Sequence, residues 1–213
     1  MGLYSKYIFP RLLDWSLGSD SFNRLRKTAL ASAAGSVLEV GFGTGLNLPN
    51  YPGTVTRLTG LDSERLLPER VAARMALSEL AIELVQLDAS STLPFPDGEF
   101  DSVVTTFTLC SIRDVGRALG EMRRVLKPGG NYLFLEHGLS DDPRIARRQD
   151  LFNPLQRIIA AGCNLNRRID ELIRGAGFDI VKVDRFIIPD APRIAGEMYL
   201  GIASREGVRG SDS

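Results

Sequence analysis

Short apolar runs rich in β-branched residues recur along this chain, separated by longer stretches with apolar residues at helical spacing. This alternation is typical of a parallel sheet whose two faces are covered by helices. The runs predicted as strands are 37–40, 55–61, 82–87, 102–107, 131–135, 178–188 and 197–204. The main stretches predicted as helices between them are 66–80, 115–126 and 166–174. The pattern therefore predicts an α/β fold with a doubly wound, mostly parallel sheet.

An amphipathic flank, residues 3–34, precedes the first predicted strand. Its apolar stripe, interrupted at Pro10, consists of Tyr4, Tyr7, Ile8, Leu12, Leu13, Trp15 and Leu17. A second helix is predicted at 21–33, where a serine can cap its first turn. Packing against the sheet edge, a lid over a ligand site, and contact with a membrane surface beside Lys6 and Arg11 all explain the stripe.

The length and charge of the chain limit which classes of protein it can belong to. The 213 residues suffice for one α/β domain with extensions, so we define 1–34 as an N-terminal helical cap, 35–205 as the main domain and 206–213 as a flexible tail. Acidic and basic residues number 26 each, which disfavours nucleic acid as a partner. There is no signal-like N-terminus and no apolar stretch of about 18 residues. We therefore expect a cytoplasmic protein without stable membrane insertion, and leave peripheral contact and oligomeric state open.

The two cysteines, Cys110 and Cys163, lie far apart in the sequence and lack the spacing of zinc ligands. Neither a disulfide framework nor a metal site is expected, and reduced thiols fit a cytoplasmic protein. We interpret Cys163 as a buried rather than a reactive residue.

A glycine-rich turn follows the first predicted strand, with Gly41, Gly43 and Gly45 in alternation. Glycine lets a ligand lie directly on the backbone, as nucleotide-type ligands do at the first βα turn of such sheets. The dinucleotide pattern G-x-G-x-x-G would need a glycine where Leu46 stands. Glu39 would also repel a pyrophosphate, whereas it suits a cofactor with a cationic amino acid end. A dinucleotide and a purely structural turn remain alternatives. The helix after the turn is predicted to start at Asn47 and to be broken by prolines.

Acidic residues end the next two predicted strands. Asp62, followed by Ser63, lies about 20 residues after the glycines, where a carboxylate accepts hydrogen bonds from ribose hydroxyls. The alternative for Asp62 is a helix N-cap. Asp88 and Ala89 follow the third strand.

Five motifs occur in order: E-V-G-F-G-T-G at 39–45, L-D-S at 61–63, L-D-A at 87–89, L-P-F-P-D-G-E-F-D at 93–101 and M-R-R-V-L-K-P-G-G at 122–130. Together they resemble the class I S-adenosylmethionine (SAM) methyltransferases that include the ubiquinone/menaquinone C-methyltransferases, the methyltransferase type 11 family. The segments T-L-C-S-I, F-L-E-H and G-C-N-L-N-R are similar to methyltransferase-like proteins that methylate thiols. We expect no counterpart of that group's apolar N-terminal anchor, so membrane residence is not carried over from this resemblance.

The resemblance implies a Rossmann-like, seven-stranded, mostly parallel sheet with a C-terminal antiparallel hairpin strand. It implies SAM as cofactor, with S-adenosylhomocysteine as product. Glu39 and the glycines would receive the methionine part, Asp62 the ribose, and Asp88 with Ala89 the adenine. The cofactor-binding set is Glu39, Gly41, Gly43, Gly45, Asn47, Asp62, Ser63, Asp88, Ala89, Thr106 and Phe107.

The acceptor side is predicted at the exits of the fourth and fifth strands. Cys110, Ser111 and His137 are the candidate substrate-binding residues. His137, the sole histidine, is also the candidate general base; alternatively it forms a structural pair with Glu136. Residues 139–170 form an insertion that either covers the acceptor pocket or presents a solvated arginine face.

The sequence thus predicts a SAM-dependent methyltransferase acting on a small-molecule acceptor, a thiol or a lipid- or quinone-like nucleophile. A non-catalytic SAM-binding protein and an NAD(P)-dependent oxidoreductase are the alternatives.

Overall fold

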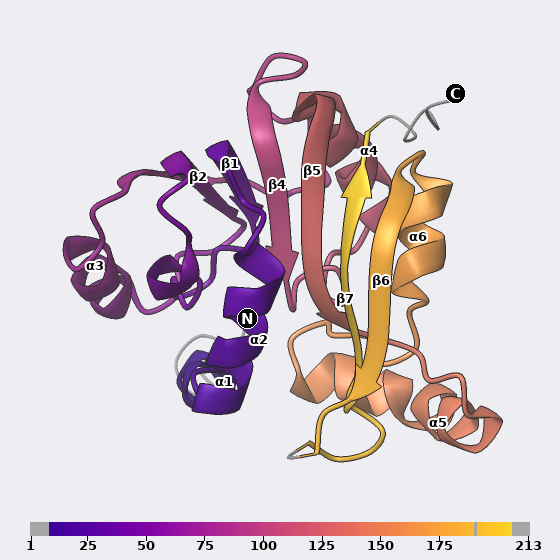
Figure 1. Ribbon diagram of the computed structural model, residues 1–213. Helices are drawn as coiled ribbons and strands as arrows, with labels where there is room; N and C mark the ends of the chain where they lie inside the picture. Colours follow the sequence, from indigo (N-terminus) through magenta and orange to yellow (C-terminus); the bar gives the residue numbers. More distant parts are fainter. Residues whose placement is uncertain (1–8, 190, 206–213) are drawn as a thin grey trace.

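The computed structural model describes residues 9–189 and 191–205 (Figure 1). This part contains a seven-stranded sheet in the order β3-β2-β1-β4-β5-β7-β6. The strands are β1 (Gly35–Val40), β2 (Val55–Asp62), β3 (Ala81–Gln86), β4 (Phe100–Thr106), β5 (Leu126–His137), β6 (Asp179–Ile187) and β7 (Glu197–Ser204). The helices are α1 (Phe9–Leu17), α2 (Asp20–Leu30), the 3-10 turn η2 (Leu48–Asn50), α3 (Pro68–Ala76), α4 (Val115–Val125), α5 (Pro143–Ile159) and α6 (Ile169–Gly175). β7 is antiparallel to β5 and β6, and the other neighbouring strands are parallel, which confirms the predicted fold class.

The strand order reverses at β1, which pairs with β2 on one side and with β4 on the other. Val40, the last residue of β1, aligns with Leu61 of β2 and Thr105 of β4. The three strands therefore end at one edge of the sheet. In doubly wound folds, ligands bind outside this carboxyl edge, at the point where the order reverses.

Both faces of the central strands are buried, because consecutive residues of a strand point to opposite sides. Val103 of β4 belongs to a core cluster with Met122 of α4, whereas Val104 belongs to a second cluster with Leu30 of α2 and Val71 of α3. Helices therefore cover both faces of the sheet.

The chain after the glycine turn departs from the prediction. Instead of a helix that starts at Asn47, only the single 3-10 turn η2 forms before β2. Pro49 lies inside this turn and Pro52 follows it, so no continuous helical hydrogen bonding is available. The Asn47 side chain is instead bonded to buried side chains.

An ion-pair network holds α1 against the glycine turn and α3. The buried Asp14 carboxylate pairs with Arg70 and with Arg74, whose Nη1 lies 2.7 Å from Oδ1. Asp14 also accepts a hydrogen bond from the Thr44 hydroxyl, and Arg74 donates to the Thr44 carbonyl at 2.8 Å. The N-terminal flank is therefore attached to the turn through its polar face.

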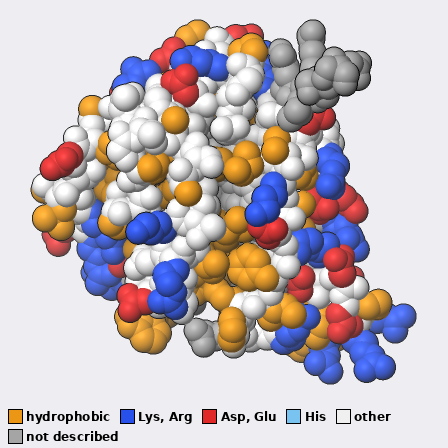
Figure 2. All heavy atoms as spheres, viewed as in Figure 1, with side chains coloured by type: hydrophobic (Ala, Val, Ile, Leu, Met, Phe, Trp, Pro, Cys, Tyr) orange, Lys and Arg blue, Asp and Glu red, His pale blue; other side chains and the backbone are white. Residues whose placement is uncertain are grey.

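Most of the apolar stripe of this flank is exposed where the structure describes it, with Leu17 half-buried; Tyr4, Tyr7 and Ile8 lie outside the described residues. Trp15 is 80% exposed, and Leu12 and Leu13 are exposed too, so packing against the sheet edge is the wrong explanation for these side chains. Helix α5 also exposes apolar residues, and Figure 2 shows hydrophobic side chains gathered over the lower part of the molecule, where α1 and α5 lie in Figure 1. Within the described chain, no helix combines the length and apolarity that crossing a bilayer requires.

Removing the Asp14 carboxylate should destabilise the protein. Asp14→Asn is expected to lower the free energy of unfolding by about 1–3 kcal/mol, since breaking a buried pair is costly but the half-exposed Arg70 can return to water. Urea unfolding followed by circular dichroism measures this. Asp179→Asn, which changes an exposed acid, serves as the matched control; equal stability of the two variants would contradict the importance of the network.

Candidate functional site

The glycine turn lies at the carboxyl edge of β1, and its three glycines have positive φ angles of 79°, 58° and 78°. At Gly41 a Cβ atom would lie 2.0 Å from Oγ1 of Thr108, so a side chain is excluded by the β4 exit. At Gly43 a Cβ atom would meet only the Gly41 carbonyl, 3.9 Å away. The turn is therefore packed against the β4 exit at Gly41, whereas the space beside Gly43, at its centre, is open.

Asp62 fastens this turn to the end of β2. Its Oδ2 accepts a hydrogen bond from the Gly43 amide at 2.8 Å, and its Oδ1 accepts one from the Glu64 amide at 3.1 Å. Burial raises the pKa of the carboxyl group, against the effect of these bonds. The N-cap alternative is wrong, because α3 begins at Pro68 and its N-cap residue is Leu67. Ser63 is exposed beside Asp62.

A buried polar network lies beneath the turn, centred on Glu39, which is only 1% exposed. Its carboxylate accepts hydrogen bonds from Asn47 Nδ2 at 2.9 Å and from the Tyr51 hydroxyl at 2.7 Å. Burial raises the pKa of Glu39 to about 7, although both hydrogen bonds and the charge of Arg26 oppose the shift. The carboxylate thus holds the segment that follows the turn.

Arg26 of α2 completes the network and was not among the predicted site residues. Its Nη1 donates to Asn47 Oδ1 at 3.0 Å and to Thr106 Oγ1 at 2.9 Å, and its guanidinium lies 5.2 Å from the centre of the Phe107 ring. Burial lowers its pKa to about 10. An arginine inside an otherwise amphipathic helix carries no sequence signal of burial, because most arginines on helices face water.

Asp88 and Ala89 lie just beyond the end of β3. The exposed Asp88 carboxylate accepts hydrogen bonds from the Ser90 hydroxyl at 2.5 Å and the Ser90 amide at 2.8 Å, which lower its pKa. The Leu87 amide donates to the Asp62 carbonyl at 2.9 Å, so the ends of β2 and β3 meet.

The exit of β4 is held by Glu136 of β5. Phe107 has a φ angle of 55°, unusual for a residue with a side chain. The next two amides, of Thr108 and Leu109, donate to Glu136 Oε2 at 2.9 and 3.2 Å. Glu136 is fully buried, and burial raises its pKa to about 8. Its role as a hydrogen-bond acceptor for this turn was missed at the sequence level.

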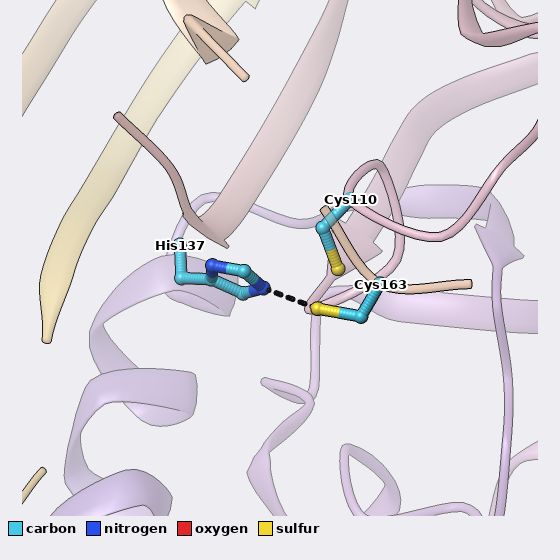
Figure 3. A group of neighbouring side chains, drawn as sticks. All are labelled: Cys110, His137 and Cys163. Atoms are coloured by element: carbon cyan, nitrogen blue, oxygen red, sulfur yellow. Dashed lines mark hydrogen bonds between the residues drawn. The ribbon is translucent and has the colours of Figure 1, made fainter. Parts of the chain in front are cut away.

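Cys110, His137 and Cys163 converge at this exit, although 53 residues separate the two cysteines in the sequence. Their Sγ, Nε2 and Sγ atoms all lie within 4.8 Å of one another, and Nε2 of His137 lies 3.0 Å from Sγ of Cys163 (Figure 3). The proposed pairing of His137 with Glu136 is wrong, since the ring contacts Cys163 and Glu136 binds backbone amides. Ser111 is exposed, with Oγ 3.5 Å from Sγ of Cys110.

The segment between α5 and α6 fixes Cys163 opposite Cys110. The backbone amide and the side-chain Nδ2 of Asn164 both donate to the Cys110 carbonyl, at 2.9 and 2.7 Å, and Arg167 donates to the Leu109 carbonyl. The Cys163 thiol and the His137 imidazole hold the pKa of Cys110 well below its ordinary range, against the effect of burial. Both cysteines are free thiols.

The structure thus collects the predicted residues at one edge of the sheet in two groups. Glu39, the glycines, Asp62 and Thr106 surround the turn, with Asp88 at the neighbouring strand end; Cys110, Ser111 and His137 lie at the exits of β4 and β5. Their assignment to cofactor and acceptor stays a prediction.

Comparison with known proteins defines the class. A family model described as a methyltransferase domain matches residues 38–134. The chain is 37% identical over 141 residues to phosphatidylethanolamine N-methyltransferase of Cereibacter sphaeroides, which covers 63% of this chain and 68% of the relative. It is 32% identical over 174 residues to thiol S-methyltransferase TMT1A of Homo sapiens, covering 79% and 70%.

A third relative is ubiquinone/menaquinone biosynthesis C-methyltransferase UbiE of Hahella chejuensis, 33% identical over 57% of this chain and 50% of the relative. Among solved structures, an O-methyltransferase family protein of Burkholderia thailandensis superimposes with a TM-score of 0.68 at 18% identity, covering 93% of this chain and 60% of that one. This likeness supports the Rossmann-like fold.

The chain belongs to the SAM-dependent methyltransferase family. The resemblance found in its motifs is confirmed, and the family and fold imply that the enzyme uses SAM.

The raised pKa of Glu39 predicts a pH dependence of stability. Between its ordinary value of 4.5 and its folded value of about 7, the unfolded chain loses a proton that the folded chain keeps, so stability falls as pH rises. Glu39→Gln removes this contribution, which is at most about 3 kcal/mol, and should flatten the curve of melting temperature between pH 5 and 7. Glu79→Gln, at an exposed acid, should leave the slope unchanged. Identical slopes for wild type and Glu39→Gln would contradict the buried titration.

Proposed function

We propose that this protein transfers the methyl group of SAM to a small-molecule acceptor, with a thiol as the preferred class and lipid- or quinone-like nucleophiles next. The proposal rests on the polar groups around the glycine turn. Asp62 and the Glu39 network meet there, at the point where the strand order of the sheet reverses. The thiol preference is supported by similarity to a thiol S-methyltransferase over most of the chain.

The polar groups around the glycine turn suit the chemistry of SAM. The open space above Gly43 is where a ligand could lie on the backbone. The Asp62 oxygens each accept one backbone hydrogen bond, and a carboxylate oxygen has a second lone pair for a ribose hydroxyl. Asp88 and the Ala89 amide would bind the adenine, and Ser63 would lie beside the ribose.

The methionine part would lie against Asn47, Thr106 and the Phe107 backbone. Glu39 is too deeply buried to touch the ligand. Its role is to hold Asn47 and Tyr51 through hydrogen bonds and to supply negative charge beneath the cationic amino group of SAM. Arg26 fixes Asn47 and Thr106 from the other side. The Glu39 network thus positions the groups that touch the ligand.

When bound, SAM supplies a methyl group on a sulfonium that a nucleophile can take by in-line displacement. The protein's part is to bring donor and acceptor together in line and to keep water away. Cys110, Ser111 and His137 would form the acceptor wall, with His137 available to accept a proton from an acceptor that needs a base.

Asp62→Ala should weaken SAM binding by at least about 100-fold, because two hydrogen bonds to a charged group contribute about 1.5–3 kcal/mol each. Isothermal titration calorimetry with SAM, and with NAD as the competing ligand, measures this. Asp97→Ala, which changes an exposed acid paired with Arg124, is the matched control. A variant that stays folded and binds SAM normally would contradict the ribose assignment, and binding of NAD instead of SAM would overturn the proposed cofactor.

The acceptor class is tested by release of S-adenosylhomocysteine. Small apolar thiols should support turnover above that of phenols and amines, and quinols or phospholipids should follow. SAM binding without turnover on any of these would indicate a non-catalytic SAM-binding protein. Turnover with proteins or nucleic acids alone would contradict a small-molecule acceptor.

A further inference from the structure

Three metal-ligating side chains from three separate segments meet at the acceptor side of the sheet edge. Cys110 lies in the loop after β4, His137 ends β5, and Cys163 lies between α5 and α6. Figure 3 shows the His137 ring and the Cys110 side chain both directed toward Cys163. The Asn164 and Arg167 hydrogen bonds to the Cys110 loop hold this arrangement, so it does not depend on a flexible contact.

We propose that Cys110, His137 and Cys163 form a binding site for one Zn²⁺ ion, whose fourth position takes the sulfur of the acceptor thiol. The second half of this proposal rests on the thiol-directed function proposed above. Two thiolates and one imidazole are a ligand set that Zn²⁺ prefers, and three protein ligands with one open position are typical of catalytic zinc.

The geometry is close to what zinc requires. With Zn–S bonds of about 2.3 Å and a Zn–N bond of about 2.0 Å, tetrahedral ligand atoms lie about 3.5–3.8 Å apart. Here all three atoms lie within 4.8 Å, and the His137–Cys163 pair lies at 3.0 Å. Small side-chain rotations, with no movement of the strands, therefore suffice to form the site.

Charge and position favour an acceptor thiolate at the fourth ligand position. Two cysteine thiolates cancel the charge of Zn²⁺, so a third thiolate leaves one negative charge. The Arg167 guanidinium, which donates to the Leu109 carbonyl next to Cys110, supplies a positive charge nearby. Cys110 follows Phe107 by three residues, which places the cluster next to the predicted methionine end of SAM. The open position would therefore face the methyl group.

The proposed methyl transfer to the acceptor thiol involves no oxidation or reduction. The acceptor thiol loses its proton to solvent on binding Zn²⁺, with His137 acting as a metal ligand and not as the base, and its sulfur lone pair forms the new S–C bond with the methyl carbon. The bond between that carbon and the sulfonium breaks, and its electron pair stays on the departing sulfur. The products are a methyl thioether and S-adenosylhomocysteine.

The test loads the full chain with Zn²⁺ or Co²⁺ under a non-thiol reductant, so that the cysteines stay reduced. Metal content after desalting gives the stoichiometry, and Co²⁺ reports tetrahedral thiolate coordination through its absorption bands. Wild type should bind one ion. Cys110→Ser, Cys163→Ser and His137→Ala should each bind at least tenfold more weakly, whereas His137→Cys, which keeps a zinc ligand, should retain one ion. Asp97→Ala is the control for a remote substitution.

Adding a small apolar thiol should shift the Co²⁺ absorption bands in wild type, and removing the metal with a chelator should lower thiol turnover at least tenfold in a way that Zn²⁺ restores. Wild type without stoichiometric metal, or serine variants that bind it as wild type does, would overturn the site. A Co²⁺ spectrum unaffected by thiol would overturn the acceptor position. One bound ion without thiol turnover would contradict the proposed function alone, and full turnover without metal would overturn the part proposed for zinc in the reaction while leaving the proposed function intact.

Discussion

A carboxylate buried at the end of a central strand determines much of how this edge of the sheet is built. Glu39 is almost inaccessible to water, and a buried carboxylate is stable only when other groups satisfy it. Asn47 and Tyr51, both in the segment after the glycine turn, donate hydrogen bonds to it, and Arg26 of α2 supplies a positive charge. Thr106 of β4 joins the network through Arg26 and Asn47. The need to satisfy one charge therefore fixes the turn, the chain after it, helix α2 and the exit of β4 relative to one another.

Glu136 has the same function on β5, on the other side of β4 from Glu39. It lies at the end of β5, fully buried, and accepts hydrogen bonds from two backbone amides of the β4 exit. These bonds hold the chain just after Phe107, whose positive φ angle costs energy that the surrounding contacts must offset. Both acids are buried and hold the chain after the glycine turn and the chain after β4 in place. The backbone and the smaller side chains of these two segments are left to face the carboxyl edge of the sheet.

Helix α1 is attached to the glycine turn, and the segment after α5 to the Cys110 loop, through polar contacts. Asp14 binds the Thr44 hydroxyl within the glycine turn and two arginines of α3, and Arg167 and Asn164 bind carbonyls of the Cys110 loop. Several apolar side chains of α1 and α5, Trp15 and Leu151 among them, remain exposed. Movement of either flank would thus be transmitted directly to the turn or to the cysteine cluster.

The sequence by itself determined the class of fold, the order of its strands along the chain, and the positions of Gly41, Gly43, Asp62 and Asp88 at strand ends, because strand period, glycine turns and ordered motifs are local signals. Only the tertiary structure decided the rest. Arg26 is buried because Glu39, Asn47 and Thr106 surround it, and nothing in its own helix indicates that. Cys110 and Cys163 lack ligand spacing, yet adjacent strand exits and the segment after α5 bring them to His137, since contacts across a sheet depend on strand order rather than on separation in the sequence.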